Sequence, residues 1–513
     1  MSKTQTAELP FSFQHLSLPG GVRAAMLRDP DKIALKHRDA TCTYRTLVER
    51  MDSLSSVLLS DLGLQPGCHG AIVSSNSIAY LEIILAASQS GIAMATVNPR
   101  LTPAEIVAIC DDAQAQVLFV SADYADALKT EKFASVQHLI VVDDDYEKRI
   151  AGARSLDALP VVNEWDTFTI PYTSGTTGKP KGVLVPHRSR VISLLTMAVE
   201  YGCYSPDDRF LAIAPMCHGA GMIFALAPIF FGGYAEIMDK FEPEEVLKRF
   251  DSEGITGFFG VPTHFHAIFG VGQDVLGKYK HEALHTIISN AAPLPQAMKE
   301  KIIDHFGPIL HETYGSTEAS IVSNLRPADQ LRKQACVGQA FPLTKVEIRD
   351  QDGKECAPDE VGELFSTSPC LFNGYWNRPE ETEEAFHAGW VTVGDLAKKD
   401  SEGHLYIVDR VKDMVISGGV NIYPREIEEV LLQHAEISDA AIVGLPDEKW
   451  GERIKAFIVQ APGASLSAED VQAFCEGRIS SMKTPKDVEF IELLPRNANG
   501  KVLKTELRAR QGS

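Results

Sequence analysis

Directly after the apolar run 168–171, the chain reads Tyr172-Thr173-Ser174-Gly175-Thr176-Thr177-Gly178-Lys179-Pro180-Lys181-Gly182. Three glycines in this segment let backbone N–H groups turn towards one point, and the hydroxyl and lysine side chains add further donors. The segment is therefore predicted to be a loop that binds a polyphosphate. It is not a Walker A loop, because the spacing is G-x-x-G-K and Pro180 stands where Ser or Thr would hold Mg²⁺. The alternative is a solvated turn.

Four further motifs follow in the order Tyr314-Gly315-Ser316-Thr317-Glu318, Trp390-Val391-Thr392-Val393-Gly394-Asp395, Asp409-Arg410-Val411-Lys412-Asp413 and Asn499-Gly500-Lys501. Their order and spacing resemble the adenylate-forming superfamily, which comprises acyl-CoA synthetases, aryl-CoA ligases, luciferases and the adenylation domains of peptide synthetases. The resemblance covers nearly the whole chain. It implies that a carboxylate attacks the α-phosphate of ATP, with Mg²⁺ as cofactor and CoA as acceptor of the acyl group.

Size and charge limit the other possibilities. The chain has 513 residues, more than one hydrophobic core usually supports, and a net charge of −20 that argues against nucleic acid and anionic membranes as partners. Nine cysteines lie far apart and show no metal-ligand spacing. No signal peptide, apolar run of membrane-spanning length or peroxisomal tripeptide is visible, so we expect a cytoplasmic protein, monomeric or homodimeric.

Strand-like apolar runs alternate with helical patterns between residues 70 and 320, which predicts α/β layers with parallel sheets. The predicted strands are 70–74, 117–121, 139–142, 210–214, 257–261 and 286–289, and the predicted helices are 79–90, 103–111, 243–253 and 295–306. A β-rich subdomain is expected over 344–406. We place a domain boundary at 410–412, which gives a large α/β N-terminal domain, 1–410, and a small, mobile α+β C-terminal domain, 411–513.

The resemblance implies roles for the first two motifs. Loop 173–179 would wrap the β- and γ-phosphates of ATP, Thr317 would contact the α-phosphate, and Tyr314 would stack on adenine. Glu318 would bind Mg²⁺, which needs only one or two protein carboxylates beside phosphates; alternatively it is a helix-capping residue. Further nucleotide contacts are expected from Glu312, Thr313, Gly315 and Ala292.

The ribose and adenine contacts rest on the same resemblance. Asp395 would accept hydrogen bonds from both ribose hydroxyls, and Arg410 would meet the same ribose. Val393 stands where related sequences commonly have Thr, and the alternative for Asp395 is a turn residue. In Ser289-Asn290-Ala291-Ala292-Pro293-Leu294, which would abut adenine, Asn290 stands where Gly is usual and would narrow the crevice.

The resemblance also implies that the C-terminal part is a moving domain, and it assigns roles there to Lys501, Lys412, Gly418 and Gly419. Lys501 would lie between the substrate carboxylate and the α-phosphate during adenylation, where charge builds on the oxygens. Lys412 matches a hinge, about which the domain would rotate after pyrophosphate leaves. Gly418 and Gly419 would then line a tunnel for the pantetheine arm of CoA; alternatively they form a turn before a helix. A surface position is the alternative for Lys501.

The acyl pocket is the least specified part. By resemblance it would be lined by His218 as a gate or wall and by Gly219, Phe259 and Asn290. The segments 219–224, 258–260 and 290–291 contain no Arg or Lys that would pair with a second carboxylate. We therefore predict an apolar medium-chain or aryl monocarboxylate as substrate, in preference to oxalate or malonate.

Four functions compete at this point. An acyl-CoA synthetase leads, followed by a stand-alone adenylation enzyme that loads a carrier protein and by a luciferase-like oxygenase. A fused peptide-synthetase module is not expected, because no carrier domain follows Lys501. A non-catalytic binding protein would be expected to have lost Lys501, Glu318 or Asp395, and all three remain.

Overall fold

The computed structural model describes residues 16–174, 180–496 and 502–510. The chain forms two compact units. The first comprises the chain up to Lys345 together with Ser366–Val391, and the second comprises Val346–Phe365 and the chain from Thr392 onwards. A boundary at 410–412 stays a prediction.

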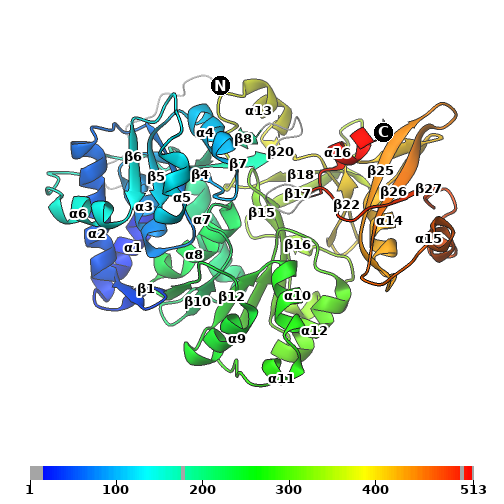
Figure 1. Ribbon diagram of the computed structural model, residues 1–513, viewed down its shortest axis with the longest axis horizontal. Coiled ribbons are helices and arrows are strands. Elements are labelled where there is room, and N and C mark those ends of the chain that lie inside the picture. Colours follow the sequence, from blue (N-terminus) through cyan, green and yellow to red (C-terminus); the bar gives the residue numbers. More distant parts are fainter. Residues whose placement is uncertain (1–15, 175–179, 497–501, 511–513) are drawn as a thin grey trace. The chain divides into compact units, whose positions relative to one another are not determined.

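The first unit contains a nine-stranded sheet with the order β16-β15-β14-β13-β12-β10-β11-β1-β2 (Figure 1). The strands β1, β10, β11, β12, β13 and β14 are parallel to one another. At the two edges the pairing is antiparallel, between β1 and β2 at one edge and between β14, β15 and β16 at the other. Their bounds are β1 (Ile33–His37), β2 (Ala40–Thr43), β10 (Arg209–Ala212), β11 (Tyr234–Ile237), β12 (Gly257–Gly260), β13 (Thr286–Ser289), β14 (Leu310–Ser316), β15 (Ser320–Leu325) and β16 (Gln339–Ala340).

A second sheet in this unit has the order β6-β5-β3-β4-β7-β8, and β9 also pairs with β7. The strands from β6 to β7 are parallel, as runs buried on both faces predict. The bounds are β3 (His69–Val73), β4 (Ala93–Val97), β5 (Ala115–Ser121), β6 (His138–Val142), β7 (Thr167–Ser174), β8 (Pro180–Gly182) and β9 (Val185–Pro186).

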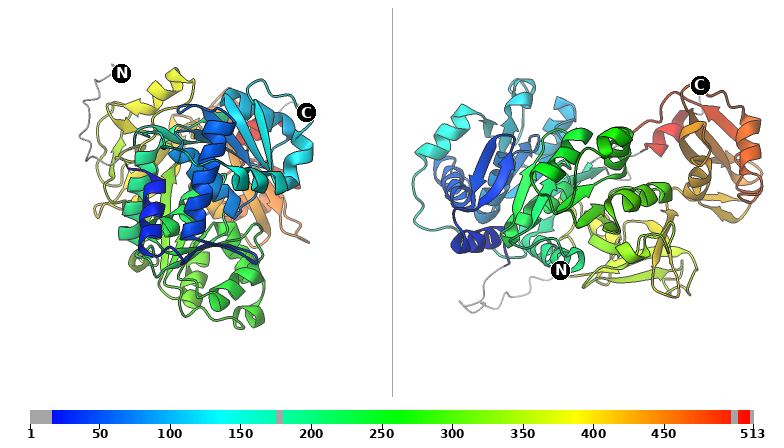
Figure 2. Two further views of the ribbon diagram at one scale, coloured as in Figure 1. Left: turned by 90° about the vertical axis from the view of Figure 1, so that its left-hand side faces the viewer. Right: turned by 90° about the horizontal axis from the view of Figure 1, so that it is seen from below.

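Helices cover both faces of each sheet, and one helical layer is shared. On β5, Val117 and Phe119 belong to the same core as α2 (Tyr44–Ser56), α3 (Ile78–Gln89), α7 (His187–Tyr201) and α8 (Gly219–Phe231). That core also includes Phe259 of β12 in the other sheet. Because successive strand residues face opposite sides, α2, α3, α7 and α8 lie between the two sheets. The same elements can be followed from two further sides in Figure 2.

The outer faces have cores of their own. The nine-stranded sheet packs there on α9 (Pro243–Ser252), α10 (Pro262–Gly270) and α12 (Gln296–Phe306), and the second sheet on α4 (Pro103–Asp112) and α5 (Ala122–Leu128). The strands and helices predicted between residues 70 and 320 are thus confirmed, with bounds that shift by a few residues. Other helices of this unit are α1 (Leu18–Arg28), α6 (Asp144–Gly152), α11 (Gln273–Leu276) and α13 (Pro379–Ala385), beside strands β19 (Phe386–His387) and β20 (Trp390–Val391).

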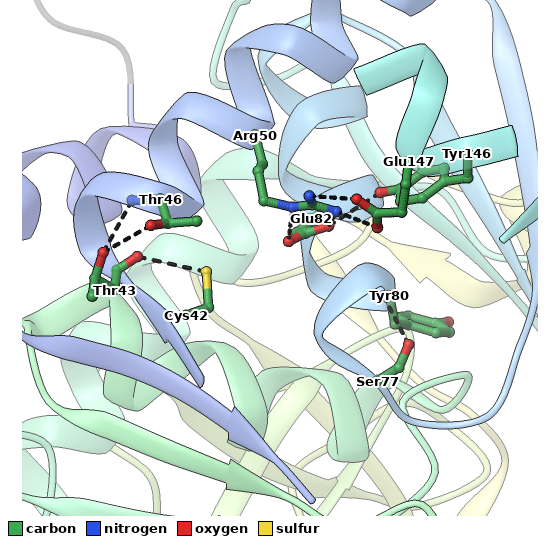
Figure 3. A network of polar contacts seen from close by, with 9 residues as sticks. All are labelled: Cys42, Thr43, Thr46, Arg50, Ser77, Tyr80, Glu82, Tyr146 and Glu147. Atoms are coloured by element: carbon green, nitrogen blue, oxygen red, sulfur yellow. Dashed lines mark hydrogen bonds and ion pairs between the residues drawn. The ribbon is translucent and has the colours of Figure 1, made fainter. Parts of the chain in front are cut away.

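An ion-pair network ties the helices at one end of this unit together (Figure 3). Glu82 on α3 has a side chain only 2% exposed, and Arg50 on α2 donates to its two oxygens at 2.6 and 3.0 Å. Arg50 also donates to Glu147 on α6, at 2.8 Å, and the Tyr146 hydroxyl donates to Glu82 at 3.2 Å. The buried carboxylate is therefore satisfied by side chains from two other helices.

The second unit is an α+β arrangement. The strand β18 (Gly362–Thr367) begins in it and pairs with β17 (Lys345–Arg349) and β21 (Asp395–Lys399), and β21 pairs with β22 (Leu405–Arg410). A separate sheet has the order β24-β23-β26-β25, with β27 on β26. Its strands are β23 (Val415–Ser417), β24 (Val420–Ile422), β25 (Ile437–Asp447), β26 (Gly451–Gln460) and β27 (Asp487–Phe490), with helices α14 (Pro424–Leu431), α15 (Ala468–Cys475) and α16 (Lys504–Ala509). The mixed α/β fold class is confirmed.

No helix in the described part of the chain is long and apolar enough to span a membrane.

Candidate active site

The predicted phosphate loop connects two neighbouring antiparallel strands of the first unit. Thr173 on β7 pairs with Lys181 on β8, and Ser174 pairs with Pro180. Gly175, Thr176, Thr177, Gly178 and Lys179 lie outside the described residues, so their predicted contacts with phosphate stay predictions. Near the end of β7, the Tyr172 hydroxyl donates to Asp112 at 2.7 Å, which anchors this strand to the end of α4.

The segment with Thr317 and Glu318 is the turn between β14 and β15. Close approach of the two strands requires Gly315, because a Cβ there would lie 2.1 Å from the carbonyl oxygen of Ser320. The Ser316 hydroxyl accepts a hydrogen bond from the Ala319 N–H at 3.0 Å, which closes the turn. The packing of the turn thus holds Thr317 and Glu318 at the edge of a parallel sheet.

Glu318 is buried and held by a residue that the sequence analysis did not identify. The Tyr375 hydroxyl donates to its Oε1 at 2.9 Å, and the Lys181 ammonium lies 5.1 Å from the centre of the Tyr375 ring. The backbone oxygen of Glu318 accepts from the Phe372 N–H at 2.9 Å. A tyrosine far along the chain gives no local signal of this contact.

The carboxylate of Glu318 suits a magnesium ion that also binds phosphates. No group of three or more His, Cys, Asp or Glu that could hold a metal occurs within residues 16–174, 180–496 and 502–510. Mg²⁺ keeps several water or phosphate ligands and needs only one or two protein carboxylates. The donor set therefore fits a metal that arrives with ATP.

The strand end expected near adenine contains a strained residue and a side-chain hydrogen bond to the neighbouring strand. Ala291 has φ +75°, a left-handed conformation that is unfavourable for alanine. Asn290, next to it, donates to the Thr313 hydroxyl at 2.7 Å, so its side chain points to β14. The next residue, Ala292, is exposed to solvent. The predicted narrowing of the crevice by Asn290 stays a prediction.

Glu312 is engaged inside the protein. Its Oε1 accepts from the Leu294 N–H at 3.1 Å, and its other oxygen forms an ion pair with Lys299 of α12. Both side chains are almost fully buried, at 6% and 2% exposed. This pair fixes the segment around residue 294 against β14. Lys299 was missed because a lysine in an amphipathic helix usually faces solvent.

Of the residues expected around the acyl group, Phe259 belongs to the core shared by the two sheets, and Gly219 is the first residue of α8. His218 is the N-cap residue of α8 and is half-buried. Burial, and then the charge of Arg100, lower the pKa of its imidazole, so the ring is neutral at neutral pH. Phe259 and Phe224 stack with ring centres 4.1 Å apart and an interplanar angle of 11°.

A cation lies next to this group that the sequence analysis did not consider. Arg190 of α7 is buried, and its Nη2 atom lies 3.1 Å from where a Cβ of Gly219 would be. Segments chosen by family position did not include α7. A usable signal was present, since Arg190 precedes the run Val191-Ile192-Ser193-Leu194-Leu195 in a helix that is buried on most sides.

In the second unit, the two residues predicted to bind ribose contact each other. Asp395, which is buried, begins β21 and lies opposite Arg410, the last residue of β22. The Arg410 Nε donates to Asp395 at 2.7 Å. Gly394 takes φ +76° and its carbonyl accepts from the Val411 N–H, which shapes the turn. An ion pair that presents carboxylate oxygens at a strand end is consistent with a ribose contact and does not test it.

The predicted hinge and tunnel residues lie in tight turns. Lys412 is exposed in a turn where the Asp413 N–H donates to the Arg410 carbonyl at 3.0 Å. Gly418 and Gly419 have φ +59° and +80° and join β23 to β24 as a two-residue hairpin loop, for which glycine is preferred. Trp450 packs on Gly418, since a Cβ there would lie 2.8 Å from its ring. Lys501 lies outside the described residues.

Comparisons with known proteins agree in family. The AMP-binding enzyme family matches residues 22–376, and the AMP-binding enzyme C-terminal domain matches residues 426–501. A feruloyl-CoA synthase from Amycolatopsis sp. is 33% identical over 493 residues, which cover 96% of this chain and 98% of that protein. ATP-bound MatB from Rhodopseudomonas palustris superposes with a TM-score of 0.87 at 28% identity, covering 97% and 99% of the two chains. The o-succinylbenzoate CoA synthetase from Bacillus subtilis, solved with its acyl-adenylate intermediate, has a TM-score of 0.87 at 27% identity, covering 96% and 98%.

Proposed function

Because the chain belongs to the family of AMP-binding enzymes, we propose that it is an AMP-forming acid–CoA ligase that acts on an aromatic carboxylic acid. In the first half-reaction the acid attacks the α-phosphate of ATP, which gives an acyl-adenylate and pyrophosphate. In the second, the thiol of CoA attacks the acyl carbon, which gives the thioester and AMP. The similarity to CoA ligases along nearly the whole chain supports this reaction.

The aromatic part of the proposal rests on one observation, the stacked rings of Phe224 and Phe259. The ring of Phe210 is also nearly parallel to that of Phe224, with ring centres 6.2 Å apart and an interplanar angle of 7°. Parallel rings favour a flat aromatic neighbour by offset stacking, which is worth about 0.5–1.5 kcal/mol beyond the buried area. A flexible alkyl chain gains the area term but not the stacking.

The expected metal contribution is separate. When bound, Mg²⁺ neutralises charge on the phosphate oxygens during pyrophosphate release. Glu318 would hold the ion, and the hydrogen bond from Tyr375 would fix the orientation of that carboxylate. Tyr375→Phe should therefore raise the Mg²⁺ concentration needed for half-maximal pyrophosphate release, by about 10-fold or more. An unchanged Mg²⁺ requirement would remove this role.

The function is tested by measuring pyrophosphate release and thioester formation with benzoate, 4-hydroxycinnamate, hexanoate, octanoate, oxalate and malonate, each with and without CoA. We expect thioester only when CoA is present and the highest kcat/KM with an aromatic acid. Adenylate that forms but never yields a CoA thioester would favour a carrier-loading enzyme. A higher kcat/KM with hexanoate or octanoate would contradict the aromatic assignment, and one with oxalate or malonate would contradict the whole pocket interpretation.

A further inference from the structure

Arg190 is a buried cation that forms no ion pair with any residue that the structure describes. It is 6% exposed, its Nε atom is covered and lacks a hydrogen-bond partner, and no carboxylate of the described residues pairs with its guanidinium. Among the titratable groups, the thiol of Cys370 acts on the pKa of Arg190 and raises it. Burial raises the pKa of that thiol, so it is uncharged at neutral pH and does not compensate the guanidinium.

The backbone around Arg190 adds to the positive potential. Arg190 lies at the beginning of α7, a helix of 15 residues, and its Nη2 lies against Gly219 at the beginning of α8, a helix of 13 residues. Neither helix has an acidic residue in its first turn, and neither has a side-chain hydrogen bond at its N-cap. Helix N-termini carry about half a positive charge, so the beginnings of both helices add positive potential near the guanidinium. The carboxylate of Glu164 at the beginning of α7 pairs with Arg188, not with Arg190.

An arrangement of this kind is unfavourable in the free protein. Burying an unpaired charge costs several kcal/mol, and burial lowers the pKa of Arg190 to about 10, which still leaves it charged at neutral pH. A bound oxygen that accepts hydrogen bonds from the guanidinium would remove most of that penalty. The Arg190 Nη2 atom lies 3.1 Å from where a Cβ of Gly219 would be, next in the chain to His218, where the resemblance places the acyl group.

We propose that Arg190 determines specificity for the acid by binding an oxygen substituent on its aromatic ring, either a hydroxyl or a second carboxylate. This inference rests on the proposed function and refines its substrate class. The reacting carboxylate is not the ligand meant here, because the resemblance assigns that group to Lys501. A guanidinium presents parallel N–H donors, which suit a carboxylate bidentately and a phenolic oxygen singly.

The experiment compares kcat/KM for benzoate, 3- and 4-hydroxybenzoate, and isophthalate and terephthalate in the wild type and in Arg190→Leu. The wild type should prefer an oxygenated acid to benzoate. Arg190→Leu should lose about 10- to 100-fold on that acid, the range for a hydrogen bond to a charged group, with a much smaller change on benzoate. A loss of kcat/KM on the hydroxybenzoates would identify a hydroxyl as the bound group, and a loss on isophthalate or terephthalate would identify a second carboxylate. Arg190→Lys should keep part of the preference, because it retains the charge without the fork.

Arg188→Leu is the matched control, two residues away on α7. Its guanidinium donates to Glu164 at 2.8 Å and lies over Trp165, so this variant should leave the order of the acids unchanged. Stability provides a second readout. Without substrate, Arg190→Leu should unfold at the same or a higher urea concentration than the wild type, since an unpaired buried charge has been removed.

Three results would overturn the inference. One is an equal loss on benzoate and on the oxygenated acids, which would indicate a general effect on the reacting carboxylate or on the fold. Another is a wild type without preference for an oxygenated acid. The third is a marked loss of stability in Arg190→Leu. Turnover of octanoate without turnover of any aromatic acid would instead refute the proposed function.

Discussion

Arg50→Met tests how far the first unit depends on its buried ion-pair network. The substitution removes both donors to the Glu82 oxygens, at 2.6 and 3.0 Å, and leaves the 3.2 Å hydrogen bond from Tyr146. Glu82 would then be a carboxylate with a side chain 2% exposed and no cation. Breaking a buried pair by removing one partner costs about 3–5 kcal/mol, and we expect a decrease of that size in the free energy of unfolding.

Two further variants separate this effect from surface charge. Glu147 forms the exposed arm of the network, with a side chain 56% exposed, so Glu147→Gln should cost about 1 kcal/mol or less. The double variant Arg50→Met/Glu82→Met removes both buried charges and should recover a large part of the loss. The diagnostic result is the difference in stability loss between removing the buried pair with Glu82 and removing the exposed pair with Glu147, because Arg50 forms both pairs.

The assay is urea unfolding followed by tryptophan fluorescence in a Trp450→Phe background. The other tryptophans, at 165, 376 and 390, all belong to the first unit, so the signal reports that unit alone. Midpoints are compared only where the slopes agree. A loss below about 1 kcal/mol for Arg50→Met, or no recovery in the double variant, would refute the reasoning.

Three other outcomes are expected. Lys501→Ala should slow adenylation by about 10²-fold or more while leaving thioester formation from a supplied acyl-adenylate nearly unchanged; equal loss in both half-reactions would contradict its role. Lys412→Pro should spare adenylation and slow CoA transfer by restricting the hinge, and two unimpaired rates would remove the hinge hypothesis. Burial lowers the pKa of His187 from 6.5 to about 4, so the stability due to its neutral ring is present above pH 6.5 and is lost as the pH falls towards 4. His187→Gln should make the urea midpoint of unfolding depend less steeply on pH between 6.5 and 4. An unchanged dependence of the midpoint on pH would contradict this role of His187.

Local pattern predicted the elements of the first unit well and their assembly poorly. Strands such as 286–289 and helices such as 243–253 are confirmed because their apolar spacing is a local property. The sharing of α7 and α8 by two sheets could not be predicted in this way, since it depends on contacts between distant segments. In the second unit, the apolar run 440–443 forms only the middle of the eleven-residue β25, whose outer residues pair with β26 and lack a continuous apolar run.

The candidate site shows the same division. Motifs identified Thr317, Glu318, Asp395 and Arg410 as candidates, and the structure has these residues in a turn and at strand ends. The supporting residues Tyr375 and Lys299 lie far from those motifs along the chain, and only the folded structure brings them to Glu318 and Glu312. Spacing in a sequence identifies groups that act in one segment and does not identify the side chains that hold them.

The contact of Arg190 with Gly219 couples two positions that are 29 residues apart in the chain. The guanidinium occupies the volume into which a side chain at position 219 would grow, because Nη2 lies only 3.1 Å from the missing Cβ. A side chain at position 219 would therefore require the tip of Arg190 to move by a few tenths of an ångström. Both helices are packed between two sheets, so neither can shift to make room.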